Sequence, residues 1–119
     1  MIFVNNLLKD VNIKGYPKGS VIFKEGDQSK EMYIVIEGDV KILKRDTRIA
    51  AVGKGQIFGE MALVDKSPRS ASAVALTDCK LAAVDERQFI TMVQNTPDFA
   101  LQVMRIMVER LRDTTNLIV

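Results

Sequence analysis

The sequence predicts a mainly β domain of the sandwich or barrel type that ends in helices. In the first two-thirds of the chain, short runs rich in β-branched and apolar residues are separated by glycine-bearing turns. The last third instead places its apolar residues at helical spacing. Many short strands at regular spacing are typical of a sandwich or barrel, with the helices packed against it.

The expected strands share an apolar, β-branched centre and a turn at one or both ends. They are Ser20–Lys24, Met32–Ile36, Val40–Lys44, Arg48–Val52, Ser70–Leu76 and Lys80–Val84. Tight reversals are expected at Glu37-Gly38-Asp39 and at Arg45-Asp46-Thr47, because these residue types favour turns. The sole cysteine, Cys79, is expected to be a core residue rather than a reactive thiol.

Two helices are expected after the last strand. Asp85, with Gln88 three residues later, predicts a capped helix over about 86–94. Thr96 and Pro97 mark the start of a second helix over about 97–113. That helix has one apolar side with Phe99, Val103 and Ile106, and another with Leu101, Met104, Val108 and Leu111. Two apolar sides predict contact with the barrel and with something else besides; complete packing within its own domain is the alternative.

Composition excludes several classes of function. The 119 residues have a net charge of only +2, which argues against direct nucleic-acid binding through a clustered basic face. No apolar run is long enough to span a bilayer, and residues 1–10 lack the pattern of a signal peptide. A single cysteine fits a reducing, cytoplasmic location. The absence of histidine removes the commonest metal ligand and general base, so no catalytic residue and no metal site are expected.

The residues expected to bind a ligand lie in the segment 53–73, GKGQIFGEMALVDKSPRSASA. Gly59 permits close approach of a ligand to the backbone, and the following Glu60–Leu63 run suits one helical turn with free N–H groups. Arg69 suits a phosphate, which a guanidinium binds with two parallel hydrogen bonds. The Glu60 carboxylate can accept a hydrogen bond from a sugar hydroxyl. Its alternative role is an ion pair with Lys66 or Arg69. The segment therefore predicts a ligand with a phosphate beside a ribose.

The stretches FGEMAL at 58–63 and SPRSAS at 67–72 resemble the phosphate-binding cassette of cyclic nucleotide-binding domains. That family includes catabolite activator proteins, regulatory subunits of cAMP-dependent protein kinase and cyclic nucleotide-gated channels. GSVIFKEGD at 19–27 and MYIVIEGDV at 32–40 resemble the first barrel strands and the hairpin of the family. The resemblance covers roughly residues 16–113. It implies one domain with a double-stranded β-helix (jelly-roll) barrel over about 16–84 and a C-terminal lid helix.

Carried over position by position, the resemblance implies that Glu60 accepts from the ribose 2′-hydroxyl and Arg69 pairs with the cyclic phosphate. Ser70, directly after that arginine, implies cAMP as the ligand, with cGMP as the alternative. The candidates for capping the base are Arg105, Val108 and Arg112. The alternative is that they belong to a solvated polar stripe of the helix with an apolar seam. The implied ligand-binding residues are Gly59, Glu60, Met61, Ala62, Arg69, Ser70 and Ala71.

The implied function is that of a sensor, not an enzyme, whose terminal helix shifts when the nucleotide binds. A cupin-like enzyme is the remote alternative, since its site needs histidines. A degenerate non-binding domain, or the sensor part of a transcription regulator without its DNA-binding part, are further alternatives. The expected partners are the nucleotide, then a second copy through the terminal helix or an unidentified effector protein. Leu7–Asp10 is at most a remnant of the N-terminal helices of the family.

Overall fold

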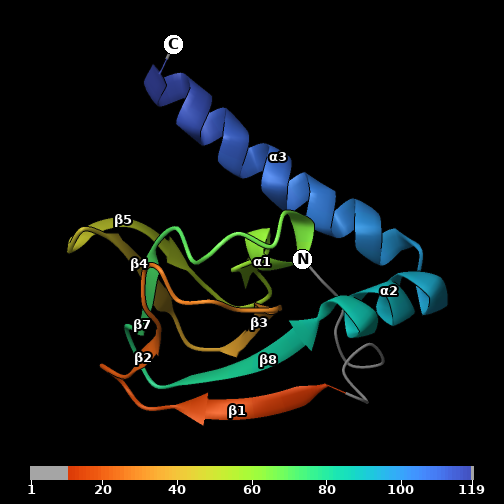
Figure 1. Cartoon of the computed structure of the whole chain (residues 1–119), viewed down its shortest axis with the longest axis horizontal. Coiled ribbons are helices and arrows are strands. Elements are labelled where there is room, and N and C mark those ends of the chain that lie inside the picture. Colours follow the sequence, from red (N-terminus) through yellow and green to blue (C-terminus); the bar gives the residue numbers. More distant parts are fainter. Residues whose placement is uncertain (1–10, 119) are drawn as a thin grey trace.

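The computed structural model describes residues 11–118, and it describes side chains as far as Arg110. Figure 1 shows strands gathered into a β body at one end of which the helices lie. The strands are β1 (Asn12–Tyr16), β2 (Val21–Phe23), β3 (Glu31–Glu37), β4 (Val40–Lys44), β5 (Thr47–Val52), β6 (Ile57–Phe58), β7 (Ser72–Ala75) and β8 (Cys79–Asp85). The helices are α1 (Met61–Val64), α2 (Glu86–Asn95) and α3 (Asp98–Ile118).

The strands form two four-stranded sheets with the orders β1-β8-β3-β6 and β2-β7-β4-β5. Every pairing in the described part of the chain is antiparallel. The mainly β class with C-terminal helices is therefore confirmed, as a jelly-roll-like sandwich. The expectation of a barrel needs correction, because the described strands pair within two separate sheets and do not close into one.

Each expected strand is present, with ends that differ by one or two residues. Two strands were not expected. β1 contains Gly15 and is almost fully exposed, so it has no apolar alternation to reveal it, and it forms only by pairing along the edge of β8. β6 is two residues long and pairs with Tyr33 and Ile34 of β3, a contact that its local sequence does not specify.

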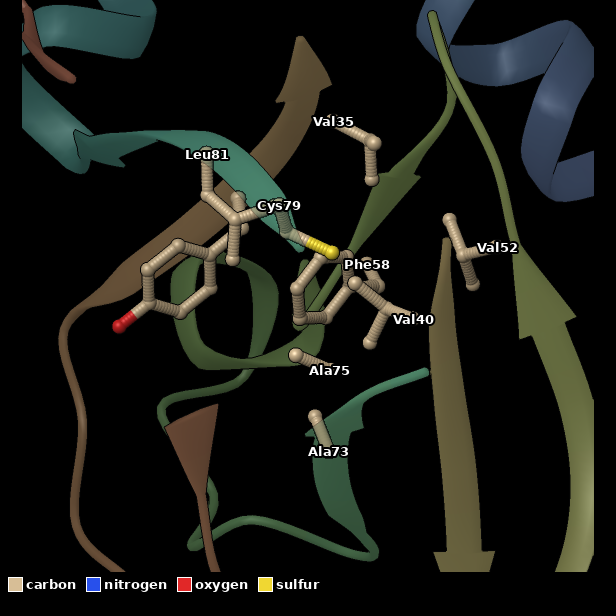
Figure 2. Packing of buried hydrophobic residues seen from close by; sticks show 9 residues of the cluster. Val35, Val40, Val52, Phe58, Ala73, Ala75, Cys79 and Leu81 are labelled. Atoms are coloured by element: carbon tan, nitrogen blue, oxygen red, sulfur yellow. The ribbon is translucent and has the colours of Figure 1, made fainter. Parts of the chain in front are cut away.

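β3 supplies side chains to two separate cores. Its residues alternate in direction, as strand geometry requires. Tyr33 and Val35 join the core between the sheets, whereas Met32 and Ile34 join a second core under the helices. Burial on both faces explains why this strand reads as a continuous apolar run. Figure 2 shows the inter-sheet core, with the Cys79 sulfur beside Phe58 and Val40. Cys79 is buried, which confirms its expected place in the core.

The second core attaches the helices to the β body. α2 begins with the predicted reciprocal cap, in which the Gln88 N–H donates to Asp85 Oδ1 and the Asp85 N–H donates to Gln88 Oε1, both at 2.8 Å. On α3, Phe99 is fully buried and Val103 almost so. The opposite face is left open: Leu101, Met104 and Val108 are 48%, 51% and 45% exposed. Complete packing of this helix within its own domain is therefore wrong for the described side chains.

α3 is also the longest element that the structure describes. No helix in the described part of the chain is both long enough and apolar enough to cross a membrane.

The turn between β3 and β4, which lie in different sheets, generates a stability prediction. Gly38 has a φ of +90°, and a Cβ placed there would lie 2.3 Å from the Asp78 carbonyl oxygen. Gly19 has a similar φ of +86° but nothing within 4 Å of its Cβ position. Gly38→Ala should therefore cost about 2 kcal/mol more stability than Gly19→Ala, because only the former adds a backbone clash to the left-handed strain.

Urea unfolding of the two variants measures this difference. Gly19→Ala is the matched control for the backbone conformation alone. Equal unfolding midpoints for the two variants would show that the turn between β3 and β4 relaxes around the added methyl group.

Candidate functional site

The segment between β6 and β7 forms one wall of a cavity of about 300 Å³. β6 ends at Phe58, Gly59 turns the chain with a φ of +74°, and the single turn of α1 follows. The opposite wall comes from β4 and β5. The cavity is lined by Phe23, Ile42, Ile49, Ala50, Val52, Phe58, Gly59, Glu60, Met61, Ala62, Ser67, Pro68, Arg69, Ser70, Ala71 and Arg110. Every ligand-binding residue that the sequence predicted lies in this list.

Arg69 is the charged residue at the centre of the site. Its side chain lies almost entirely below the surface, and the residue is only 5% exposed. Nη1 donates to the Gly59 carbonyl oxygen at 2.8 Å. Nη2 donates to the Glu31 carbonyl oxygen at 2.6 Å and to the Ser29 hydroxyl at 2.5 Å. These acceptors are all neutral, so they hold the guanidinium without cancelling its charge.

Aromatic rings complete the surroundings of this cation. The guanidinium carbon lies 4.0 Å from the centre of the Phe23 ring and 5.7 Å from that of Tyr33, within the range of cation–π attraction. Burial lowers the pKa of Arg69, while nearby Tyr33 and Glu31 act in the opposite direction. Burial also raises the pKa of Tyr33 to about 12, so the phenol beside the guanidinium is neutral at physiological pH.

One donor of this guanidinium is left over. Arg69 Nε is buried and has no hydrogen-bond partner among the described residues. No described carboxylate lies within ion-pair distance of the side chain either. Burying a charge without an opposite charge is costly, and so is burying an unpaired donor. An anion with acceptor oxygens in the adjoining cavity would remove both costs.

Gly59 is required by the position of Arg69. A Cβ at residue 59 would lie 2.5 Å from Arg69 Nη1, closer than real Cβ contacts approach. The positive φ independently disfavours other residues there. The backbone N–H of Ala62 donates to the Gly59 carbonyl oxygen at 3.3 Å, which is long for a hydrogen bond.

Glu60 has a partner that the sequence did not predict. Its Oε1 lies 2.6 Å from Nη1 of Arg110 on α3, and Nη2 of Arg110 donates to the Ile57 carbonyl oxygen. The Glu60 side chain is 14% exposed and that of Arg110 is 37% exposed, so this ion pair is only partly shielded from water. The expectation that Glu60 pairs with Lys66 or Arg69 is wrong: Lys66 instead lies 3.7 Å from Glu86 in an exposed pair.

The structure places Arg110 in the cavity and two of the predicted base-cap residues, Arg105 and Val108, outside it. Arg105 and Val108 are exposed on α3 and do not line the cavity, and the side chain of Arg112 falls outside the described residues. Capping by these residues stays a prediction for the ligand-bound protein. A signal for Arg110 was present, because it follows Phe99, Val103 and Ile106 at helical spacing and so shares their inward face.

A larger cavity, about 740 Å³, lies between α2, the end of α1 and the loop at 28–30. Its charged lining residues, such as Lys30, Lys66 and Glu86, are exposed to solvent. It has no buried unpaired charge, so the smaller cavity is the better candidate for specific ligand binding.

Comparison with known proteins shows the family of the chain. The family model described as cyclic nucleotide-binding domain matches residues 13–96. The chain belongs to the cyclic nucleotide-binding domain family. The matched range includes both halves of the cassette, so the resemblance seen in the sequence is confirmed.

Individual relatives of this domain are regulators. A CRP-like cAMP-activated global transcriptional regulator of Mycobacterium tuberculosis is 30% identical over 115 residues, which cover 92% of this chain and 51% of the regulator. The chain therefore spans about half the length of that curated relative. The structure of the Thermus thermophilus catabolite activator protein superimposes with a TM-score of 0.86 at 31% identity, covering 97% of this chain and 56% of that one.

One of the similar solved structures is named as an enzyme. The structure of the EAL enzyme Bd1971 in a halfsite-occupied form matches with a TM-score of 0.68 at 37% identity, covering 88% of this chain and 98% of that one. The relatives of this cyclic nucleotide-binding domain thus include proteins with different named activities.

The ion pair between α3 and the cassette generates a prediction about helix dynamics. Arg110→Ala should speed amide exchange in α3 roughly five-fold, because it removes about 1 kcal/mol of attachment to the cassette. Hydrogen exchange read by mass spectrometry over 98–118 and over β3 measures the effect.

Arg105→Ala is the matched control, since Arg105 lies on the same helix but is exposed. It should leave exchange unchanged, and β3 should be protected equally in all three proteins. Unchanged exchange of α3 in Arg110→Ala would show that the apolar contacts alone hold the helix.

Proposed function

We propose that this domain is a sensor that binds a cyclic nucleotide, cAMP by preference, in the cavity beside Arg69. The buried, unpaired Nε of Arg69 is the observation that most supports it, because a phosphate supplies both the negative charge and the acceptor that are missing. The cavity volume of about 300 Å³ falls at the lower end of the range for small-molecule sites.

The lining of the cavity divides into regions that suit the parts of such a ligand. The cyclic phosphate is assigned to Arg69 and to the backbone around Gly59 and Ser70. The ribose is assigned to Glu60, whose carboxylate accepts hydrogen bonds from hydroxyl groups. The base is assigned to the apolar wall formed by β4 and β5, where Ile42, Ile49 and Val52 line the cavity.

The proposed output is a change in the placement of α3. Glu60 is assigned to the ribose hydroxyl, yet in the structure it is bound to Arg110. A ligand that engages Glu60 alters this ion pair and so shifts the balance between placements of the helix. The effect is a population shift, and its size is limited by the difference in ligand affinity between the two placements.

Other functions compete with this proposal. A degenerate domain that binds nothing is disfavoured, because such a domain has no need to keep a buried Nε donor of Arg69 without a partner. The sensor part of a longer transcription regulator remains a form of the same proposal, since the relatives are about twice as long. The domain itself is assigned no catalytic role, and cGMP is the alternative ligand.

The central prediction is that cAMP stabilises the domain. A ligand at a hundred times its dissociation constant adds about 2.7 kcal/mol, which should raise the melting temperature by roughly 10 °C. AMP should give a smaller shift, and cGMP tests the base preference. Calorimetry should show that Arg69→Ala weakens cAMP binding at least thirty-fold, or by about 2 kcal/mol.

Lys54→Ala is the control for nonspecific loss of a positive charge, since Lys54 is exposed and does not line the cavity. Arg69→Lys keeps the charge but not the fork of donors, so it should recover only part of the affinity. No thermal shift with any cyclic nucleotide would exclude the sensor function, and wild-type affinity in Arg69→Ala would remove Arg69 from the site.

A second copy of the domain is the proposed partner of the open face of α3. Leu101, Met104 and Val108 are spaced by three and four residues, as in the seam of paired helices, and are about half exposed. We expect Met104→Glu to weaken self-association at least ten-fold, because it places a charge within an apolar seam. Sedimentation equilibrium over a range of concentrations measures the change.

Glu109→Lys is the control, since it changes the charge on the polar side of the same helix. A wild-type protein that is monomeric at high concentration would refute the second-copy proposal and leave an effector protein as the partner.

A further inference from the structure

The loop between β2 and β3 forms hydrogen bonds with both the main chain and the side chain of Arg69. The Gly26 N–H donates to the Arg69 carbonyl oxygen, and the Arg69 N–H donates to the Asp27 carbonyl oxygen, both at 2.8 Å. Farther along the same loop, Ser29 and Glu31 accept from Nη2 of the side chain. A segment some forty residues away in sequence therefore holds this one residue.

Ser29 is the only member of this set that acts through a side chain. Its Oγ accepts from Arg69 Nη2 at 2.5 Å and from the Glu31 N–H at 3.2 Å. The second bond ties the hydroxyl to the start of β3, so the acceptor itself is held in place. Replacing Ser29 would change the guanidinium environment without altering any backbone acceptor.

A count of donors shows what these bonds leave for a ligand. A guanidinium has five N–H groups. Both of those on Nη2 are used by Ser29 and Glu31, and one on Nη1 is used by Gly59. Within the described residues, the Nε donor and the second Nη1 donor remain. With the Nη2 end anchored, the plane of the guanidinium is fixed, and so are the directions of the remaining donors.

We propose that Ser29 is a positioning residue, whose hydroxyl orients the Arg69 guanidinium for the phosphate of the ligand. This inference rests on the proposed function. Ser29 lines the neighbouring 740 Å³ cavity and not the 300 Å³ one, so it acts through Arg69 rather than by touching the nucleotide. Its neutral hydroxyl accepts a hydrogen bond and leaves the positive charge available to the phosphate.

A purely structural role for Ser29 makes a different prediction. If the hydroxyl only supported the loop through the Glu31 N–H, its loss would lower stability and weaken every ligand alike. If it orients Arg69, its loss should weaken ligands in proportion to their use of the phosphate. Comparing cAMP with adenosine, which has the same base and sugar but no phosphate, separates the two roles.

Calorimetric titration of Ser29→Ala with cAMP and adenosine tests the proposal. We expect cAMP affinity to fall about ten-fold, in line with the loss of one hydrogen bond to a charged group, and adenosine affinity to change less than two-fold. Ser29→Thr keeps the hydroxyl and should restore cAMP binding. Ser29→Cys, which keeps the volume but is a poor acceptor, replaces Ser29→Ala if that variant does not fold.

Lys30→Ala is the matched control, because Lys30 is an exposed neighbour in the same loop. It should leave both affinities unchanged. Equal cAMP binding by wild type and Ser29→Ala, or an equal loss for cAMP and adenosine, would overturn the positioning role while leaving the sensor function intact. A wild-type protein that binds no cyclic nucleotide would instead refute the proposed function, and this inference with it.

Discussion

The Arg69 guanidinium is buried next to a cavity, and no described carboxylate lies within ion-pair distance of it. This constraint accounts for much of the surrounding structure. Gly59 must lack a side chain because Nη1 occupies the space of a Cβ. The β2–β3 loop must bring acceptors to the Nη2 end, and Phe23 must present its ring face. Leaving any of these donors unpaired in the interior would cost stability, so the cassette, the loop and the aromatic cluster depend on one another.

A second guanidinium connects this arrangement to the helices. Arg110 bonds to Glu60 and to Ile57 of β6, so α3 is attached to the β body by charge as well as by the apolar contacts of Phe99 and Val103. The two attachments differ in character. No residue of the second core lines the cavity, whereas the ion pair involves a carboxylate that does. In the proposed function, a ligand acts on the helix through this ion pair.

The two arginines also show why the site is built where it is. The sandwich provides a rigid frame, with β3 buried on both faces and contributing to both cores. Between β6 and β7 the cassette is irregular apart from the single turn of α1, so its backbone there takes no part in sheet pairing. Placing polar backbone and charge on an irregular segment that is fixed at its ends by strands is a common way to form a binding site.

The sequence by itself determined the fold class, the cap of α2 at Asp85 and the cassette residues that line one side of the cavity, because glycine turns, strand alternation and a cassette without gaps are local patterns. It did not determine β1 or β6, which form only through pairing with partners distant in the chain. Nor did it predict the partner of Glu60 or the acceptors that Ser29 and Glu31 offer to Arg69, since these contacts join residues thirty-eight to fifty positions apart. Tertiary structure decided them, because the positions of long polar side chains depend on packing between elements and not on neighbouring residues.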